Sequence, residues 1–226
     1  MKLDDINKEE AFRYLGYGTM LPDEQTMMIA DDCEKRLLSV IDAKYIYRYF
    51  KINRADSTEK ELVLDGTSFR LCGSSIVSHL EGCDGAVLFA ATLSEGVDRL
   101  IRQLSVRKMS AAVIADSMAS AAIEQVCDIV EREITEQFEG RYATWRFSPG
   151  YGDFPLEAQG SFLDVLSAQK RIGVNITGGG LMTPCKSVTA VIGISDREIE
   201  KKRSGCSVCR MKDTCKFRKK GEHCGV

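Results

Sequence analysis

The sequence predicts an α+β protein with an antiparallel or mixed twisted sheet and flanking helices. Two long segments, 23–43 and 105–139, carry apolar residues at helical spacing. Shorter segments alternate polar with apolar residues or are continuously apolar, as strands are. These helices and strands interleave irregularly, without the repeated strand–helix–strand unit of a parallel sheet. We see no internal repeat.

The first part of the chain is expected to form two helices, over residues 5–16 and 23–43. Tyr45–Ile52 alternates aromatic and basic residues like a strand, and Glu61–Leu64 is a second short strand. A small helix is expected over Ser75–His79. In the helix 23–43, apolar residues recur every three or four positions: Met27, Ile29, Cys33, Leu37, Leu38 and Ile41.

The central part is expected to form a buried strand, Ala86–Thr92, followed by helices. Ser94-Glu95 has the capping residue and the early acid that open a helix. A single long helix is predicted over residues 105–139, with an apolar arc and a narrow polar stripe. The simplest interpretation of the stripe is a solvent-facing surface. Its members are Ser117, Ser120, Glu124, Asp128 and Glu131.

The last part of the predicted domain contains one more helix and one more strand. Ser161-x-x-Asp164 resembles a capping box, so a helix is expected to start there and to stop at Gly173. Three glycines at 178–180 predict a flexible turn, although they would also let the backbone approach a ligand closely. Val188–Ile194 is the final predicted strand.

The composition predicts a globular protein of the cytoplasm. Of the 226 residues 44% are hydrophobic and 28% are charged, and only four are proline, which argues against disorder. The first ten residues are too charged for a signal peptide. The longest apolar run, Gly85–Leu93, is far shorter than the ~20 residues of a membrane-spanning helix. We therefore expect no association with a membrane.

The strongest candidate for a functional site is the hexapeptide Arg146-Phe147-Ser148-Pro149-Gly150-Tyr151. Proline fixes its own φ and disfavours helix at the residue before it, while glycine accepts unusual φ values, so the chain must turn here. Arg146 supplies a planar cation that can grip a carboxylate at two points, and Tyr151 supplies a flat ring with a polar tip. A zwitterionic ligand with a flat ring would suit them. The alternative is an ordinary loop whose arginine pairs with a surface carboxylate.

This segment resembles the activation domain of cobalamin-dependent methionine synthases, over roughly residues 85–196. The resemblance rests on Arg146-x-x-Pro-Gly-Tyr-x-x-x-Pro155 and on Pro184-x-x-Ser187-Val-Thr189. It implies an activation domain-like fold and S-adenosylmethionine as the ligand. By resemblance Arg146, the backbone of Ser148, and Tyr151 hold that ligand, and Tyr151 faces the corrin.

The resemblance also implies a fourth binding residue, a reaction and partners. Glu124, aligned with a helix glutamate that contacts the ligand in the family, would take its amino group or another polar handle. In the family's reductive methylation, an electron reduces cob(II)alamin and the sulfonium methyl traps the cobalt(I) nucleophile. The chain has no recognisable homocysteine, folate or cobalamin module. It is therefore expected to act in trans on a cobalamin-binding methionine synthase or another corrinoid protein, with flavodoxin or ferredoxin supplying the electron.

A basic, cysteine-rich tail, residues 197–226, follows the predicted domain 1–196. It holds ten Lys/Arg against four Asp/Glu, whereas the rest of the chain is acidic. Cys206-x2-Cys209 could take adjacent corners of a tetrahedron, and with Cys215 and Cys224 it predicts a zinc or an iron–sulfur site. Reduced surface thiols are the alternative. Nucleic acid is a poorer fit, because Phe217 is the tail's only aromatic residue.

Nine cysteines without a secretory signal predict reduced thiols or metal ligands, not disulfides. The five outside the tail have apolar neighbours and are expected to act as small buried hydrophobes. They are Cys33, Cys72, Cys83, Cys127 and Cys185.

Two other functions remain open from the sequence. The chain could be a noncatalytic module that docks a corrinoid protein or nucleic acid through its tail, because a fold does not establish an activity. It could also be an iron–sulfur electron donor to corrinoids.

Overall fold

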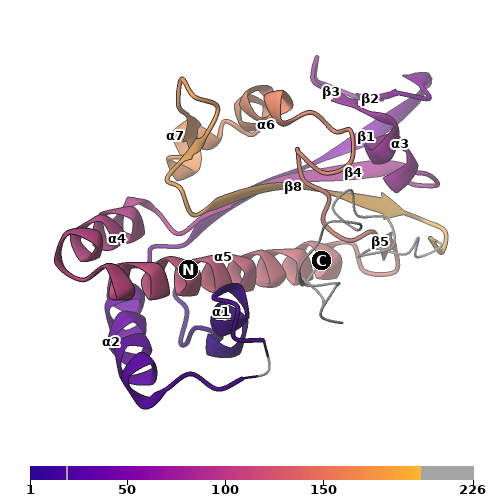
Figure 1. Cartoon of the computed structure of the whole chain (residues 1–226). Helices are drawn as coiled ribbons and strands as arrows, with labels where there is room; N and C mark the ends of the chain where they lie inside the picture. The colour runs from indigo at the N-terminus through magenta and orange to yellow at the C-terminus, as the bar shows by residue number, and fades with distance from the viewer. Residues whose placement is uncertain (19, 200–226) are drawn as a thin grey trace. The chain divides into compact units, whose positions relative to one another are not determined.

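The computed structural model describes residues 1–18 and 20–199 (Figure 1). The chain divides into two compact units that interleave along the sequence. The first unit comprises Met1–Arg48, Phe89–Gln137 and Gln159–Thr189. The second comprises Tyr49–Leu88, Phe138–Ala158 and the described residues from Ala190 onward.

The first unit is mainly helical. Its longest element is α5 (Met109–Gln137), and three helices pack against it (Figure 1). These are α1 (Lys8–Tyr14), α2 (Glu24–Val40) and α4 (Glu95–Arg107). The unit also contains α6 (Gln159–Leu166), α7 (Ala168–Ile172), β6 (Asn175–Ile176) and β7 (Met182–Thr183).

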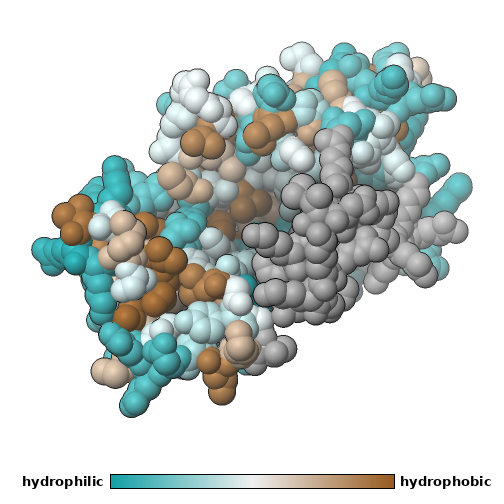
Figure 2. All heavy atoms as spheres, viewed as in Figure 1, coloured by the Kyte–Doolittle hydropathy of each residue, from teal (hydrophilic) through white to brown (hydrophobic). Residues whose placement is uncertain are grey.

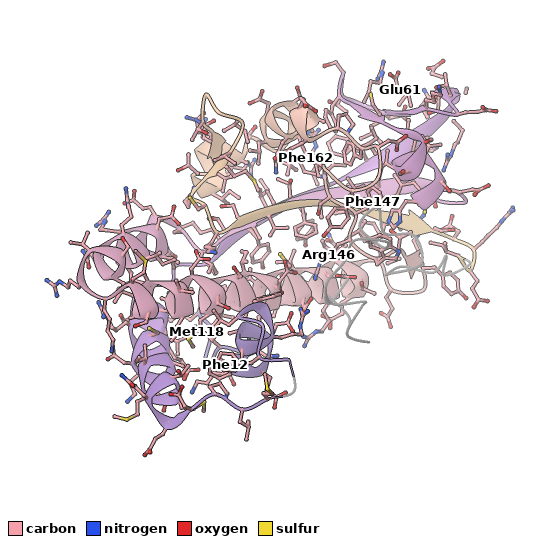
Figure 3. All side chains as sticks on the ribbon, in the orientation of Figure 1. Phe12, Glu61, Met118, Arg146, Phe147 and Phe162 are labelled. Carbon is pink, nitrogen blue, oxygen red and sulfur yellow. The ribbon has the colours of Figure 1, made fainter. Side chains whose placement is uncertain are left out.

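Local sequence signals explain why these helices form. Asn7 and Asp23 are N-caps, whose side chains accept hydrogen bonds from the Glu10 and Thr26 amides and so satisfy otherwise unpaired donors. On α5 the buried residues recur at helical spacing, and Met118 is fully buried. Phe12 of α1 is also buried, and Figure 3 labels both side chains. The core of the first unit therefore lies along α5.

Apolar side chains are also exposed on the first unit. Figure 2 shows hydrophobic residues gathered over α2, α4 and the start of α5, toward the left of the view. Those with large exposed fractions include Met28, Val106, Met109 and Val113. No helix in the described part of the chain is both long enough and apolar enough to cross a membrane.

The second unit contains most of a sheet with the strand order β3-β2-β1-β4-β8-β5 (Figure 1), and β1, β4 and β8 also include residues of the first unit. β1–β2, β2–β3 and β5–β8 are antiparallel pairs, with Ile52 opposite Leu64 and Tyr142 opposite Ser195. Helix α3 (Ser74–His79) packs against β2 and β3. The strands are β1 (Lys44–Thr58), β2 (Glu61–Leu64), β3 (Arg70–Cys72), β4 (Gly85–Thr92), β5 (Tyr142–Ala143) and β8 (Ser187–Ser195).

These elements confirm the predicted α+β class with antiparallel strand pairs. Two helix predictions are wrong in detail. The helix expected over 105–139 is two helices, because Lys108 has an extended backbone (φ −154°, ψ 97°) that ends α4 before α5 begins. No glycine or proline stands at this break to signal it.

The predicted capping box is the second error. Helix α6 begins at Gln159, so Ser161 lies inside it and cannot be its N-cap. A left-handed residue, Ser167 (φ 53°), then separates α6 from α7. Gly173 ends α7 in the left-handed conformation (φ 75°), so the predicted stop is confirmed.

Candidate functional site

The candidate site is carried by residues 146–153, which we call the clamp loop. It continues the pairing of β5 with β8: the Thr144 amide donates to the Gly193 carbonyl (2.9 Å), and Phe147 and Val191 exchange two hydrogen bonds of 2.9 Å. Phe147 is buried, and it is labelled beside Arg146 in Figure 3. The start of the loop is thereby fixed to β8.

The loop then turns, as the sequence predicts. The Tyr151 amide donates to the Ser148 carbonyl (3.0 Å), and the Gly150 amide donates to the Phe154 carbonyl (2.8 Å). Gly150 has φ +94°, a value that other residues rarely adopt. Pro149 is buried within the turn. The turn brings three of the four predicted binding residues, Arg146, Ser148 and Tyr151, onto one short loop.

Aromatic side chains surround the loop and leave part of its surface accessible. The Tyr151 ring is 41% exposed and meets Phe147 edge to face, with ring centroids 5.8 Å apart. The Trp145 and His79 rings meet edge to face, with their centroids 4.6 Å apart. The His79 Nε2 atom is 2.9 Å from the Trp145 carbonyl oxygen. Arg146 and Ser148 are half-buried. The loop therefore carries a partly exposed aromatic ring five residues after a half-buried arginine.

Ser148 has backbone capacity for a ligand. Within residues 1–18 and 20–199, no hydrogen bond engages its N–H group or its hydroxyl. Its carbonyl accepts one bond, from Tyr151, and a carbonyl oxygen can accept two. A ligand beside Arg146 could thus bind both a donor and an acceptor of Ser148.

The far end of the loop is held by Asp153, which the sequence analysis did not single out. Its carboxylate accepts hydrogen bonds from the Ser74 amide (2.9 Å), the Ser74 hydroxyl (2.6 Å) and the Ser75 amide (2.7 Å). These bonds, led by that of the Ser74 side chain, hold the pKa of the Asp153 carboxyl well below its ordinary range. A carboxylate three residues after Gly150 was the one signal in the sequence, and its partners are too distant along the chain to be recognised.

Glu124, the fourth predicted binding residue, belongs to the first unit. It is half-buried on α5 and lies near α1. Burial, followed by the carboxylates of Glu10 and Glu124, raises the pKa of Tyr14. The Arg13 Nε atom donates to Glu10 at 2.8 Å, and its guanidinium lies 4.8 Å from the centre of the Tyr14 ring. Glu124 thus lies in a polar cluster with α1, not on an open solvated face.

The predicted polar stripe on α5 needs a further correction. Ser117 is buried, and its hydroxyl donates to the Ala11 carbonyl of α1 at 2.5 Å. Ser120 is half-buried and accepts from the Lys186 ammonium at 2.9 Å. Periodicity placed these residues on one face correctly, but it could not show that α1 and the residues before β8 pack there.

A hollow in the first unit is an alternative location for a ligand. It has a volume of about 660 Å³ and is open and polar. Lys8, which lines it, forms ion pairs with Asp31 and Glu34, both at 2.7 Å. The Lys8 ammonium is thus already paired, which makes the hollow a weaker candidate than the clamp loop for an anionic ligand group. Its lining consists of Asp5, Ile6, Asn7, Lys8, Glu9, Glu34 and Gln125.

A comparison with models of protein families identifies the family of the segment that contains the clamp loop. The model of the family described as vitamin B12 dependent methionine synthase, activation domain, matches residues 67–198. The chain belongs to this family. The matched residues include the whole clamp loop and Glu124.

A solved activation-family structure has the same fold. The crystal structure of the MetH reactivation domain bound to AdoHcy aligns with a TM-score of 0.63 and 15% sequence identity. The alignment covers 96% of this chain and 82% of that chain. A comparison with curated proteins found no match. The predicted activation domain-like fold is therefore confirmed.

The predicted metal ligands, Cys206, Cys209, Cys215 and Cys224, lie outside the described residues. Among the residues that are described, no group of three or more His, Cys, Asp or Glu side chains could hold a metal ion. The five other cysteines are free, as predicted. Cys33, Cys83 and Cys127 are buried, and burial raises the pKa of Cys83 to about 11. Cys185 is exposed and Cys72 is half-buried, so the expectation of burial is wrong for these two.

Proposed function

We propose that this activation-domain protein binds S-adenosylmethionine at the clamp loop and supports reductive methylation of a corrinoid protein in trans. The observation that supports the proposal is the clamp loop itself, a tight turn within a family-matched segment that carries Arg146, Ser148 and Tyr151. The AdoHcy named with the solved MetH reactivation domain is the demethylated form of the same ligand, which supports the proposal.

Each residue has a distinct task in this proposal. The Arg146 guanidinium binds the methionyl carboxylate with two parallel hydrogen bonds. Ser148 offers its N–H group and its carbonyl oxygen to the ligand. The exposed Tyr151 ring faces the flat corrin of the partner protein. Glu124, assigned by the family resemblance, takes the ligand's amino group or another of its polar groups. The protein's contribution is positioning, because the methyl donor and the cobalt centre carry the chemistry.

The proposed reaction needs one electron and one methyl group. A reduced flavodoxin or ferredoxin gives an electron to cob(II)alamin on a cobalamin-binding methionine synthase or another corrinoid protein. The resulting cobalt(I) attacks the sulfonium methyl, which yields methylcobalamin and S-adenosylhomocysteine. We place this activity in the cytoplasm.

Isothermal titration calorimetry with S-adenosylmethionine tests the binding step. We expect binding by the native protein and an affinity on the order of 10- to 100-fold weaker for Arg146→Ala, because a charge-assisted hydrogen-bonded pair is lost. Arg146→Lys should recover only part of it, since an ammonium cannot make two parallel bonds. Arg99→Ala is the control, because Arg99 is exposed and pairs with Glu95 on α4. Absence of binding by the native protein would overturn the proposal.

A methyl-transfer assay tests the function. The protein is mixed with a cob(II)alamin-loaded corrinoid protein, a reduced flavodoxin and S-adenosylmethionine carrying a labelled methyl group. We expect label in methylcobalamin in proportion to S-adenosylhomocysteine, and a slower rate with Arg146→Ala. Transfer that is equally fast without this protein would contradict the proposal.

For the tail, Cys206, Cys209, Cys215 and Cys224 support a proposed zinc or iron–sulfur site by their spacing alone. Metal analysis and visible absorbance of anaerobically purified protein distinguish the two metals. A colourless protein with one zinc indicates the first, and charge-transfer bands with iron indicate the second. A colourless, metal-free protein excludes both.

A further inference from the structure

The clamp loop is held at both ends, and two of the residues proposed to bind the ligand, Ser148 and Tyr151, lie between the two attachments. At the first end Phe147 is paired to Val191 of β8 by two backbone hydrogen bonds. At the other end Asp153 is bound to the start of α3 by the three hydrogen bonds described above. Only Ser148 to Gly152 separate these attachments.

Two glycines make the second attachment possible. A Cβ atom on Gly73 would lie 2.8 Å from the Asp153 carbonyl oxygen, and one on Gly152 would lie 2.3 Å from the Ser75 hydroxyl oxygen. Both distances are shorter than real Cβ contacts. The two glycines also have positive φ values, +124° and +55°. A side chain at position 73 would therefore collide with the Asp153 backbone, and one at position 152 would collide with the Ser75 side chain.

The bond network is reciprocal. The Asp153 carboxylate accepts from Ser74 and Ser75, and the Ser75 hydroxyl accepts from the Asp153 amide at 3.3 Å. This pattern is that of a helix N-cap, except that the capping carboxylate comes from a segment 78 or 79 residues later in the chain. A local cap would have satisfied α3 without involving the clamp loop.

We propose that Asp153 is a positioning residue that preorganises the clamp loop for its ligand. The proposal rests on the proposed function for its ligand, but the fixing of the loop is a property of the protein alone. Asp153 touches no ligand in this proposal. It fixes the backbone two residues after Tyr151, so that the ring and the Ser148 backbone are in place before binding, and less conformational entropy is lost on binding.

Three variants test this proposal. Asp153→Ala removes all three acceptor contacts, and Asp153→Asn keeps one acceptor oxygen. Asp23→Ala is the matched control, because Asp23 also caps a helix, α2, by accepting from the Thr26 amide at 2.8 Å, but it belongs to the first unit. Thermal unfolding of all three shows how far each lost cap weakens the fold.

The first readout is amide hydrogen exchange of the ligand-free protein. We expect Asp153→Ala to accelerate exchange at the Gly150, Tyr151 and Phe154 amides, whose hydrogen bonds join residues of the clamp loop to one another or to Phe154. Asp23→Ala should leave these amides unchanged, and Asp153→Asn should fall between the two. Equal exchange at these amides in Asp153→Ala and Asp23→Ala would overturn the proposal, whether or not S-adenosylmethionine binds.

The second readout is the affinity for S-adenosylmethionine. We expect a loss on the order of tenfold for Asp153→Ala, partial recovery in Asp153→Asn, and no change for Asp23→Ala, since misplaced binding groups weaken binding without being removed. If the native protein does not bind S-adenosylmethionine, the proposed function fails and the exchange readout still decides the role of Asp153. If it binds and Asp153→Ala binds equally well, Asp153 is only a helix cap.

Discussion

The clamp loop and helix α5 hold their candidate binding residues by different physical means. The clamp loop has few buried side chains, and its shape comes from hydrogen bonds and from glycines that permit close backbone contact. Helix α5 carries Glu124 near α1, and its buried residues pack against α1, α2 and α4. The comparison teaches that damage to α5 should cost stability throughout the unit, whereas damage to the loop attachments should cost binding first.

The largest effect is expected from Met118→Ala. Met118 is fully buried on α5, so truncation leaves a cavity and should lower the free energy of unfolding by about 2–5 kcal/mol. Urea denaturation measures it, with Met109→Ala, whose side chain is 64% exposed, as the control. Affinity for S-adenosylmethionine should be unchanged in the folded protein. If folded Met118→Ala bound S-adenosylmethionine more weakly, the distinction between α5 and the clamp loop would be wrong.

A smaller loss of stability, with a larger effect on binding, is expected from Gly73→Ala. The new methyl group meets the Asp153 backbone, and φ +124° is strained for alanine, which together should cost about 1–3 kcal/mol. Gly82→Ala is the control, since φ is +79° there but no atom lies within 4 Å of the added Cβ. Urea denaturation measures the stability of both variants, and calorimetry measures their affinity for S-adenosylmethionine. The affinity should fall in Gly73→Ala only. The same defect in both variants would show that strain, not the contact with Asp153, is responsible.

Ser117→Ala should have a modest effect confined to stability. The variant leaves the buried Ala11 carbonyl without its hydrogen bond from Ser117, at a cost of about 1 kcal/mol. Urea denaturation measures this loss, and Ser105→Ala, on the exposed side of α4, is the control. An unchanged midpoint for Ser117→Ala would mean that α1 is held to α5 by apolar packing alone.

The smallest effect is a pH dependence near the end of α5. A hydrogen bond from the Tyr45 hydroxyl to Glu133 (2.5 Å), followed by burial, raises the pKa of Tyr45 from 10.0 to about 12. Between these pH values the phenol keeps its proton in the folded state and loses it in the unfolded state. Stability should therefore fall as pH rises from 10 to 12.

Tyr45→Phe should flatten this fall, which denaturation at several alkaline pH values measures. Absorbance titration of the native protein should show fewer phenols ionising near pH 10 than in a variant that lacks the Glu133 carboxylate, because Tyr45 and Tyr47 both donate to it. Identical pH slopes in the native protein and Tyr45→Phe would exclude this pair as the cause.

Much of α5 and of the strands could be predicted because their signal is local. Apolar residues at helical spacing identified α5 and α2, and the apolar run at β4 identified a strand buried along its whole length. The break at Lys108 was missed because no glycine or proline marks it. The start of α6 at Gln159 was missed because it directly follows a short 3-10 helix, Leu156–Ala158, that was not predicted. Short strands such as β3 and β5 were missed because two or three residues are too few to show an alternation of polar and apolar side chains.

The sequence by itself determined the residues of the clamp loop, its turn and its family, because proline, glycine and the arginine–tyrosine spacing act within six positions. Only the tertiary structure decided what holds that loop. Asp153 meets Ser74 and Ser75 across almost 80 residues, and Glu124 lies beside Tyr14 because α1 packs on α5. Hydrogen bonds between distant segments depend on how the chain folds back on itself, and local residue preferences do not predict which distant segments will meet.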